Sequence, residues 1–164
     1  KQNNALMPWI YRFQSEDGQP LRRPVEINTR EHFAVAGLKE IPFAVNSRWY
    51  EGSCSVRSYE LNELLGTKLR ALYQRKKGRD LFDLAIALDN RAANPEEIVA
   101  SFYIYMEHGG HKVTRTQFQE NIAAKLNDRN FTSDIGPLLA SGYAWHDIGM
   151  AKKVNDSVIS LLSD

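Results

Sequence analysis

Apolar and polar side chains alternate along the first third of the chain, which is the pattern of strands with one apolar face. Trp9 and Phe13 belong to the first such stretch, and Asp17-Gly18 supplies a turn before the second. Pro20 and Pro24 disfavour a central, fully hydrogen-bonded position for that second strand. The strands predicted from this alternation cover residues 9–13, 21–28, 43–46 and 53–57.

From residue 58 the apolar positions recur every three or four residues, which indicates helices. Ser58 and Asp80 are candidate N-caps, and Gly78 is a candidate stop between them. Stronger start signals are Asn94-Pro95-Glu96-Glu97 and the capping pair Thr114 with Gln117. The predicted helices cover residues 58–77, 80–88, 94–109, 114–127, 137–140 and 147–162. The class predicted is α+β, with a strand-rich lobe at 1–57 and a helical lobe at 58–164.

Composition, net charge and cysteine content exclude some classes of protein but do not identify one. The 164 residues are 43% apolar and 25% charged, which is typical of a globular protein. A net charge of +1 argues against a generally basic nucleic-acid coat, so any anion binding has to be local. The single Cys54 forms no intrachain disulfide, which suits a reducing cytoplasm.

The strongest local signal is a basic segment at residues 68–79. Six of these twelve positions are Lys or Arg, and Asp80 and Asp83 follow at once. On a helical wheel with Leu61 at zero, Lys68 falls at about −20° and Arg75 at about −40°, within the apolar stripe. A cation in such a stripe needs a partner, because burying it unpaired is costly. A cleft that binds phosphate or carboxylate supplies one.

The run GTKLRALYQRKKGRDLFDL at 66–84, preceded by VEIN at 25–28, resembles the AbiEii-type abortive-infection nucleotidyltransferase toxins. These belong to the polymerase-beta-like nucleotidyltransferase superfamily. The motif resemblance covers roughly residues 9–90 and implies a partial nucleotidyltransferase sheet followed by a helical lobe. It also implies transfer of a nucleotide from a nucleoside triphosphate with Mg²⁺, in the cytoplasm of a bacterium, as part of toxin–antitoxin or phage defence. An RNA acceptor, tRNA included, and a cognate antitoxin are partners that the resemblance allows.

The resemblance assigns expected roles to five residues. Lys68 matches the lysine that contacts the triphosphate, and Arg75 and Arg79 match further phosphate-binding positions. Asp80 matches a carboxylate that acts in catalysis, so Lys68 and Asp80 are the candidate catalytic residues. Glu26 matches the third carboxylate of the metal site. Carboxylate oxygens are the ligands that magnesium prefers.

One departure from the family pattern is important. The family begins its site with a Gly-Ser or Gly-Gly turn and an Asp-x-Asp pair, and neither occurs upstream of Glu26. The chain also starts at Lys1 rather than Met. We therefore expect a C-terminal portion of a longer protein that is inactive alone.

Each assigned residue has a simpler structural alternative. Glu26 could pair with Arg22 or Arg12 on an exposed strand face, and Lys68 could extend its amine into water. For Arg79 the alternative is an ion pair with Asp83, and for Asp80 it is an N-cap. At the level of function, the alternative is a non-catalytic RNA- or partner-binding module that uses Lys68–Arg79, or a packing lobe whose charges form only surface pairs.

Overall fold

The computed structural model describes residues 6–28 and 33–164, with the backbone alone described at 6–8 and 26–28. The strands are β1 (Leu6–Gln14), β2 (Pro20–Asn28), β3 (Leu38–Asn46) and β4 (Glu51–Tyr59). The helices are α1 (Leu61–Gln74), α2 (Gly78–Ala87), α3 (Pro95–His108), α4 (Arg115–Leu126), α5 (Arg129–Ser133) and α6 (Asp147–Ser157), with short 3₁₀ helices η1 (Gly136–Leu138) and η2 (Ile159–Leu161). The α+β class is confirmed.

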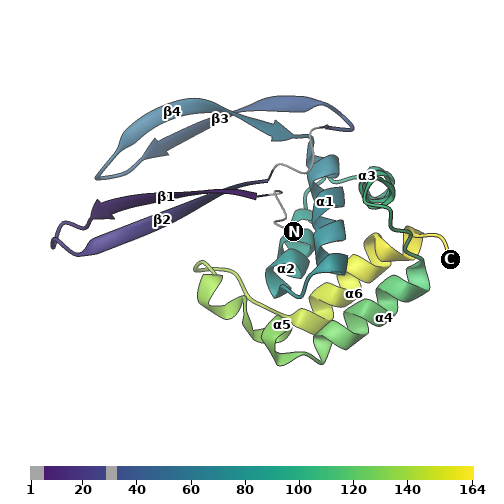
Figure 1. The fold of residues 1–164 in the computed structure, drawn as a ribbon. Coiled ribbons are helices and arrows are strands. Elements are labelled where there is room, and N and C mark those ends of the chain that lie inside the picture. The colour runs from purple at the N-terminus through teal and green to yellow at the C-terminus, as the bar shows by residue number, and fades with distance from the viewer. Residues whose placement is uncertain (1–5, 29–32) are drawn as a thin grey trace. The chain divides into compact units, whose positions relative to one another are not determined.

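Contacts divide the chain into two compact units, Lys1–Ala34 and Val35–Asp164. The first unit contains β1 and β2, and the second contains β3, β4 and the described helices (Figure 1). The two-lobe boundary at residues 57–58 stays a prediction. Among the described residues, no helix has the length and apolar character that crossing a bilayer requires.

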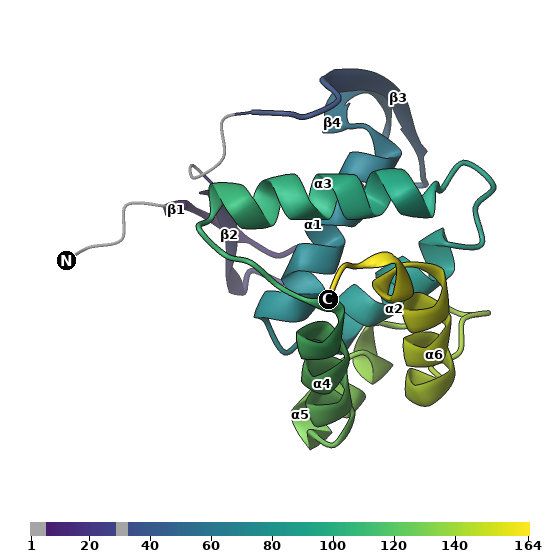
Figure 2. The same ribbon diagram turned by 90° about the vertical axis from the view of Figure 1, so that its right-hand side faces the viewer.

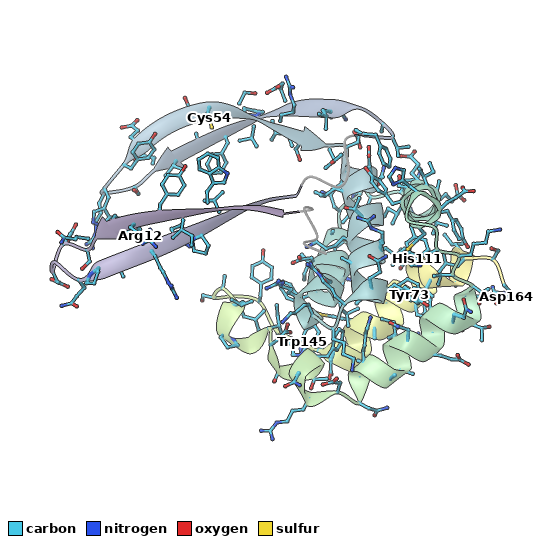
Figure 3. The ribbon with its side chains drawn as sticks, in the orientation of Figure 1. Arg12, Cys54, Tyr73, His111, Trp145 and Asp164 are labelled. Atoms are coloured by element: carbon cyan, nitrogen blue, oxygen red, sulfur yellow. The ribbon has the colours of Figure 1, made fainter. Side chains whose placement is uncertain are left out.

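Both pairs of strands are antiparallel hairpins in which one face is apolar. In β1–β2, Trp9 lies opposite Val25 and Phe13 opposite Leu21. In β3–β4, Phe43 lies opposite Cys54 and Ile41 opposite Val56, while Glu40 and Arg57 form an ion pair of 3.1 Å on the other face. Figure 3 labels Cys54 on β4, where it is an exposed free thiol.

The core of the second unit lies where α1, α2, α3, α4 and α6 meet. Figure 2 shows α3 crossing in front of α1, with α4 and α6 below this crossing. Figure 3 labels Tyr73 at the end of α1. Its ring packs against the ring of Phe118 in α4, with centroids 5.2 Å apart. Fully buried apolar side chains from these elements and from α5 include Leu69, Leu72, Leu81, Leu84, Ile98, Phe102, Phe118, Phe131 and Val154.

The crossing of α1 and α3 depends on a glycine. A Cβ on Gly66 would lie 2.6 Å from the Cβ of Ser101 and 2.9 Å from the carbonyl oxygen of Ile98. Any side chain at this position would therefore push the two helices apart. Gly66 allows the closest approach of α3 to the helix that carries Lys68.

The two predicted helix N-termini, at Asn94 and at Thr114, are confirmed. The Asn94 side chain accepts from the backbone N–H of Glu96 and Glu97, and Thr114 forms a complete capping box with Gln117. By contrast, Ser58 is not an N-cap, because it lies in β4 opposite Lys39 and α1 begins after Glu60.

The predicted end of the first helix is also wrong. It ends at Gln74, and Arg75 takes an extended conformation. Gly78 is not a stop, because it is the first residue of α2, and the N-cap of α2 is Lys77 rather than Asp80. α5, which begins after Asp128, is absent from the predicted helices.

Candidate functional site

The turn between α1 and α2 places the basic segment against α5. The backbone N–H of Gly78 donates to a carboxylate oxygen of Asp134 at 2.9 Å. A Cβ at Gly78 would lie 2.3 Å from the carbonyl oxygen of Phe131. Only glycine fits this close approach, so Gly78 fixes where α2 begins and which way its first turn faces.

Asp80, in the first turn of α2, is the central acid of the site. Its side chain is 0% exposed. Arg75 binds it with two nitrogens, Nε at 2.6 Å from Oδ2 and a terminal nitrogen at 2.7 Å from Oδ1. This hydrogen bonding raises the pKa of Arg75 above its usual value, against the smaller opposing effect of burial. The paired guanidinium compensates the buried charge, which alone would be very costly.

Lys68 faces the same acid from α1 and is joined to a second one. Its Nζ lies 2.8 Å from Oδ2 of Asp83 and 3.6 Å from Oδ1 of Asp80. The Lys68 side chain is 28% exposed, so its amine lies at the boundary of the core. The partner that the apolar stripe requires is thus a pair of carboxylates three residues apart on α2. We call Lys68, Arg75, Asp80 and Asp83 the charge cluster.

The remaining basic residues of the segment lie outside this cluster. Arg79 and Lys77 are exposed. Lys76 forms an ion pair of 2.9 Å with Asp128 at the start of α5. The alternative pairing of Arg79 with Asp83 is not formed, and Asp83 pairs with Lys68 instead. The structure therefore brings together Lys68, Arg75 and Asp80 but leaves Arg79 facing solvent.

The predicted metal ligand falls where only the backbone is described. Glu26 pairs with Pro8 in the β1–β2 register, and its side chain lies outside the described part of the structure. Within residues 6–28 and 33–164, no group of three or more His, Cys, Asp or Glu side chains is arranged to hold a metal ion. The carboxylates of Asp80 and Asp83 form ion pairs with the side chains of Arg75 and Lys68. The described residues therefore do not form a magnesium site.

The sequence interpretation missed Lys125, a buried lysine beneath the turn. Its side chain extends from α4, and its Nζ donates to the backbone carbonyls of Leu72 and Tyr73 in the last turn of α1. Burial lowers the pKa of Lys125 to about 8, and the charge of Asp80 partly opposes this effect. Lys125 falls on the same face of α4 as Phe118 and Ile122, so the argument that selected Lys68 could have found it.

Glu63 is a second buried ionisable group that was missed. Its two oxygens accept from the backbone N–H of Val35 at 2.7 Å and of Ala36 at 2.8 Å, and from the Tyr105 hydroxyl at 2.6 Å. These bonds attach the segment before β3 to α1 and α3. A Glu in the first turn of a helix is common, so no sequence signal distinguishes Glu63 from an ordinary exposed residue.

The charge cluster thus combines a buried acid, held by an arginine fork and a lysine, with exposed arginine and lysine side chains at its rim. Residues 7–146 match the family described as nucleotidyl transferase AbiEii toxin, Type IV TA system. Comparison with curated proteins and with solved structures gave no match. The family match therefore identifies the class of protein as a nucleotidyltransferase. Since the match spans well over half of the sequence, the chain belongs to the AbiEii toxin family of type IV toxin–antitoxin systems.

Proposed function

We propose that this chain carries the triphosphate-binding part of a nucleotidyltransferase that transfers a nucleotide to an acceptor. The observation that supports this most is the charge cluster, in which Lys68 and Arg75 converge on the buried Asp80. The family implies a nucleoside triphosphate as substrate and an antitoxin as the toxin's counterpart. In the proposal Lys68, Arg75 and Arg79 bind phosphate oxygens and Asp80 acts in catalysis. We place this activity in the bacterial cytoplasm.

In the proposal, a bound triphosphate replaces an aspartate as the partner of a lysine in the charge cluster. Lys68 is bound to the half-exposed Asp83, so phosphate oxygens can compete for its amine from solvent. The Arg75 side chain is 49% exposed while the acid that it holds is fully buried. Arg75 can therefore keep its fork on Asp80 and offer its remaining donors outward. Arg79 is exposed and forms no ion pair within the described residues, so it adds a third cation at the rim.

Nucleotidyl transfer needs a divalent cation to neutralise phosphate oxygens, so we propose Mg²⁺ as the cofactor with Glu26 among its ligands. The described residues offer no complete magnesium site. The sequence also contains no Asp-x-Asp pair. We propose that these 164 residues alone are catalytically silent. Transfer would require paired carboxylates that they do not contain.

The experiment is a transfer assay with labelled nucleoside triphosphates and bulk bacterial RNA. It compares the 164-residue chain with any longer product of the same gene whose additional segment contains an Asp-x-Asp pair. Transfer only by the longer protein, and only with magnesium, is the expected result. Robust transfer by the chain alone would overturn the proposal that carboxylates are missing. Loss of transfer in Glu26→Gln, with Glu16→Gln unchanged, is expected if Glu26 is a metal ligand.

Lys68 has a matched control in Lys152, an exposed lysine of α6 that also pairs with an aspartate. Lys68→Ala should abolish transfer and toxicity of the longer protein without unfolding it, and Lys152→Ala should change neither. Equal activity of the two variants would remove Lys68 from the triphosphate site.

The second candidate function is a phosphate-gripping module that performs no chemistry. It is favoured by the exposure of Lys77 and Arg79 at the tip of the α1–α2 turn. Such a module should bind RNA with an affinity that falls steeply with salt and is independent of magnesium. A nucleotide site should instead distinguish triphosphate from monophosphate.

A further inference from the structure

Helix α1 ends without any of the usual stop signals. The last carbonyls of a helix have no partner within the helix and need one from elsewhere. Arg75 follows the helix in an extended conformation, so no left-handed glycine caps its end. The backbone N–H of Arg75 satisfies the carbonyl of Ala71. The next two carbonyls, of Leu72 and Tyr73, accept from the amine of Lys125.

Lys125 is buried, so its amine can bind the carbonyls at the end of α1 but cannot reach a ligand in solvent. Only 3% of the residue is exposed, and its amine points at the C-terminal end of α1. The partial negative charge at that end favours a cation. The desolvation that lowers the pKa of Lys125 is the cost of this arrangement. A residue so buried, with its amine bound to two carbonyls, cannot itself grip a triphosphate.

Two further contacts hold the same turn from the same side. Lys76 pairs with Asp128 at 2.9 Å, and the N–H of Gly78 donates to Asp134 at 2.9 Å. The α4–α5 region therefore restrains both ends of the three-residue link that carries Arg75. Arg75 needs a defined backbone position, because both of its bonds to Asp80 are short and directional.

We propose that Lys125 is a positioning residue of the nucleotide site: by fixing the last turn of α1, it places Arg75 where its fork holds Asp80. The inference rests on the proposed function for its consequence on triphosphate binding. Its structural part, the effect of Lys125 on Arg75, can be tested separately. The competing role is that Lys125 stabilises the fold without influencing the charge cluster.

The protein contains a matched control for Lys125. Lys153 of α6 donates to the carbonyl of Ala85 at 3.0 Å, in the last turn of α2, and to Asp89 at 2.6 Å. It holds a helix C-terminus in the same way, but at the end of α2 away from Asp80. Lys153→Met thus removes an equivalent contact without touching the turn at Arg75.

The experiment compares wild type, Lys125→Met and Lys153→Met in the 164-residue chain. The first readout is the NMR signal of the Arg75 Nε–H and its rate of exchange with solvent. The second is the affinity for ATP and GTP without metal. In Lys125→Met the Arg75 signal should shift and exchange faster, and triphosphate affinity should fall by about tenfold or more, since small misplacements of binding groups are costly. Lys153→Met should leave both readouts at their wild-type values.

Each outcome decides between the two roles. An unaltered Arg75 signal in Lys125→Met would overturn the proposal, as would equal changes in both variants. If wild type binds no triphosphate, the proposed function fails, while the Arg75 signal still decides the role of Lys125. If Lys125→Met does not fold, Lys125→Gln is used instead. Its uncharged amide is one atom closer to the backbone than the lysine amine, so it cannot hold the carbonyls of Leu72 and Tyr73 in their present positions, and the same two readouts apply to it. A folded Lys125→Gln whose Arg75 signal and affinity match wild type would likewise reject the proposal.

Discussion

Two phenylalanines show how differently the helices and the β3–β4 hairpin use their apolar faces. Phe102 in α3 is 0% exposed, whereas Phe43 in β3 is 55% exposed. Both positions belong to clear periodic patterns in the sequence. The helical stripe meets several neighbouring helices, but the hairpin has only two strands and one apolar face. Periodicity therefore predicts an element and its apolar face, while burial depends on whether a second layer covers that face.

The same contrast applies to the charges. Asp80 and Asp83 lie three residues apart on α2, yet one is 0% exposed and the other 44% exposed. Asp80 is enclosed by α1 and held by Arg75, while Asp83 faces solvent and binds Lys68 alone. Three pairs of variants and one comparison of pH profiles measure how much these differences of environment contribute.

The largest effect is expected for the paired phenylalanines. Phe102→Ala should lower the free energy of unfolding by about 3–5 kcal/mol, because it leaves a cavity in the core. Phe43→Ala should lower it by about 1 kcal/mol or less, since half of that ring already contacts water. Urea denaturation of both variants provides the measurement. Equal losses would contradict the contrast between helices and hairpin.

The paired aspartates come next. Asp80→Asn should cost about 3 kcal/mol of stability, because it breaks a buried ion pair and its arginine fork. Asp83→Asn should stay within about 1 kcal/mol, as expected for a half-exposed pair. Thermal unfolding near neutral pH measures both. A larger loss at Asp83 would mean that Lys68 depends on the exposed acid more than on the buried one.

Two helical glycines should respond to alanine with opposite signs. Gly66→Ala should destabilise by about 1–3 kcal/mol, because its Cβ would collide with Ser101 and the backbone of α3. In α6, the nearest atom to a Cβ at Gly149 is 3.8 Å away. Gly149→Ala should therefore stabilise by up to about 1 kcal/mol, the ordinary gain of alanine in a helix. Chemical denaturation of both variants gives the two signs directly.

The last and most gradual effect concerns pH. The pKa of Lys125 is lowered from 10.5 to about 8 in the folded protein, first by burial. Between these two values the unfolded state binds more protons, so stability should rise with pH through this window. The slope from one group is at most about 1.4 kcal/mol per pH unit. Lys125→Met should lack this rise, and the difference between the wild-type and variant pH profiles isolates it from other titrating groups.

The elements that could be predicted from the sequence are those determined by residues close together in the chain. The caps at Asn94 and Thr114 need only their own neighbours, and both were confirmed. The stripe that contains Lys68 also predicted a partner for its amine, which α2 supplies. The proposed roles in binding and catalysis stay predictions, as does the metal role of Glu26.

Features set by distant segments could not be found in this way. The end of α1 depends on Lys125, and the start of α2 depends on the approach of Gly78 to Phe131. Read locally, Gly78 indicated a stop, because a glycine after a helix commonly is one. Glu63 likewise has polar partners on other elements, so nothing near it in the sequence reveals that it is buried.

The long separation between the α1–α2 turn and its supports also has a consequence during translation. Lys125, Asp128 and Asp134 lie 53, 52 and 56 residues beyond the groups that they hold. A ribosome that adds about 5–20 residues per second needs several seconds to make that stretch. A nascent chain that has just passed Asp83 already contains the whole basic segment, but not the three side chains that hold its turn. The turn can reach its final form only after α5 has left the exit tunnel.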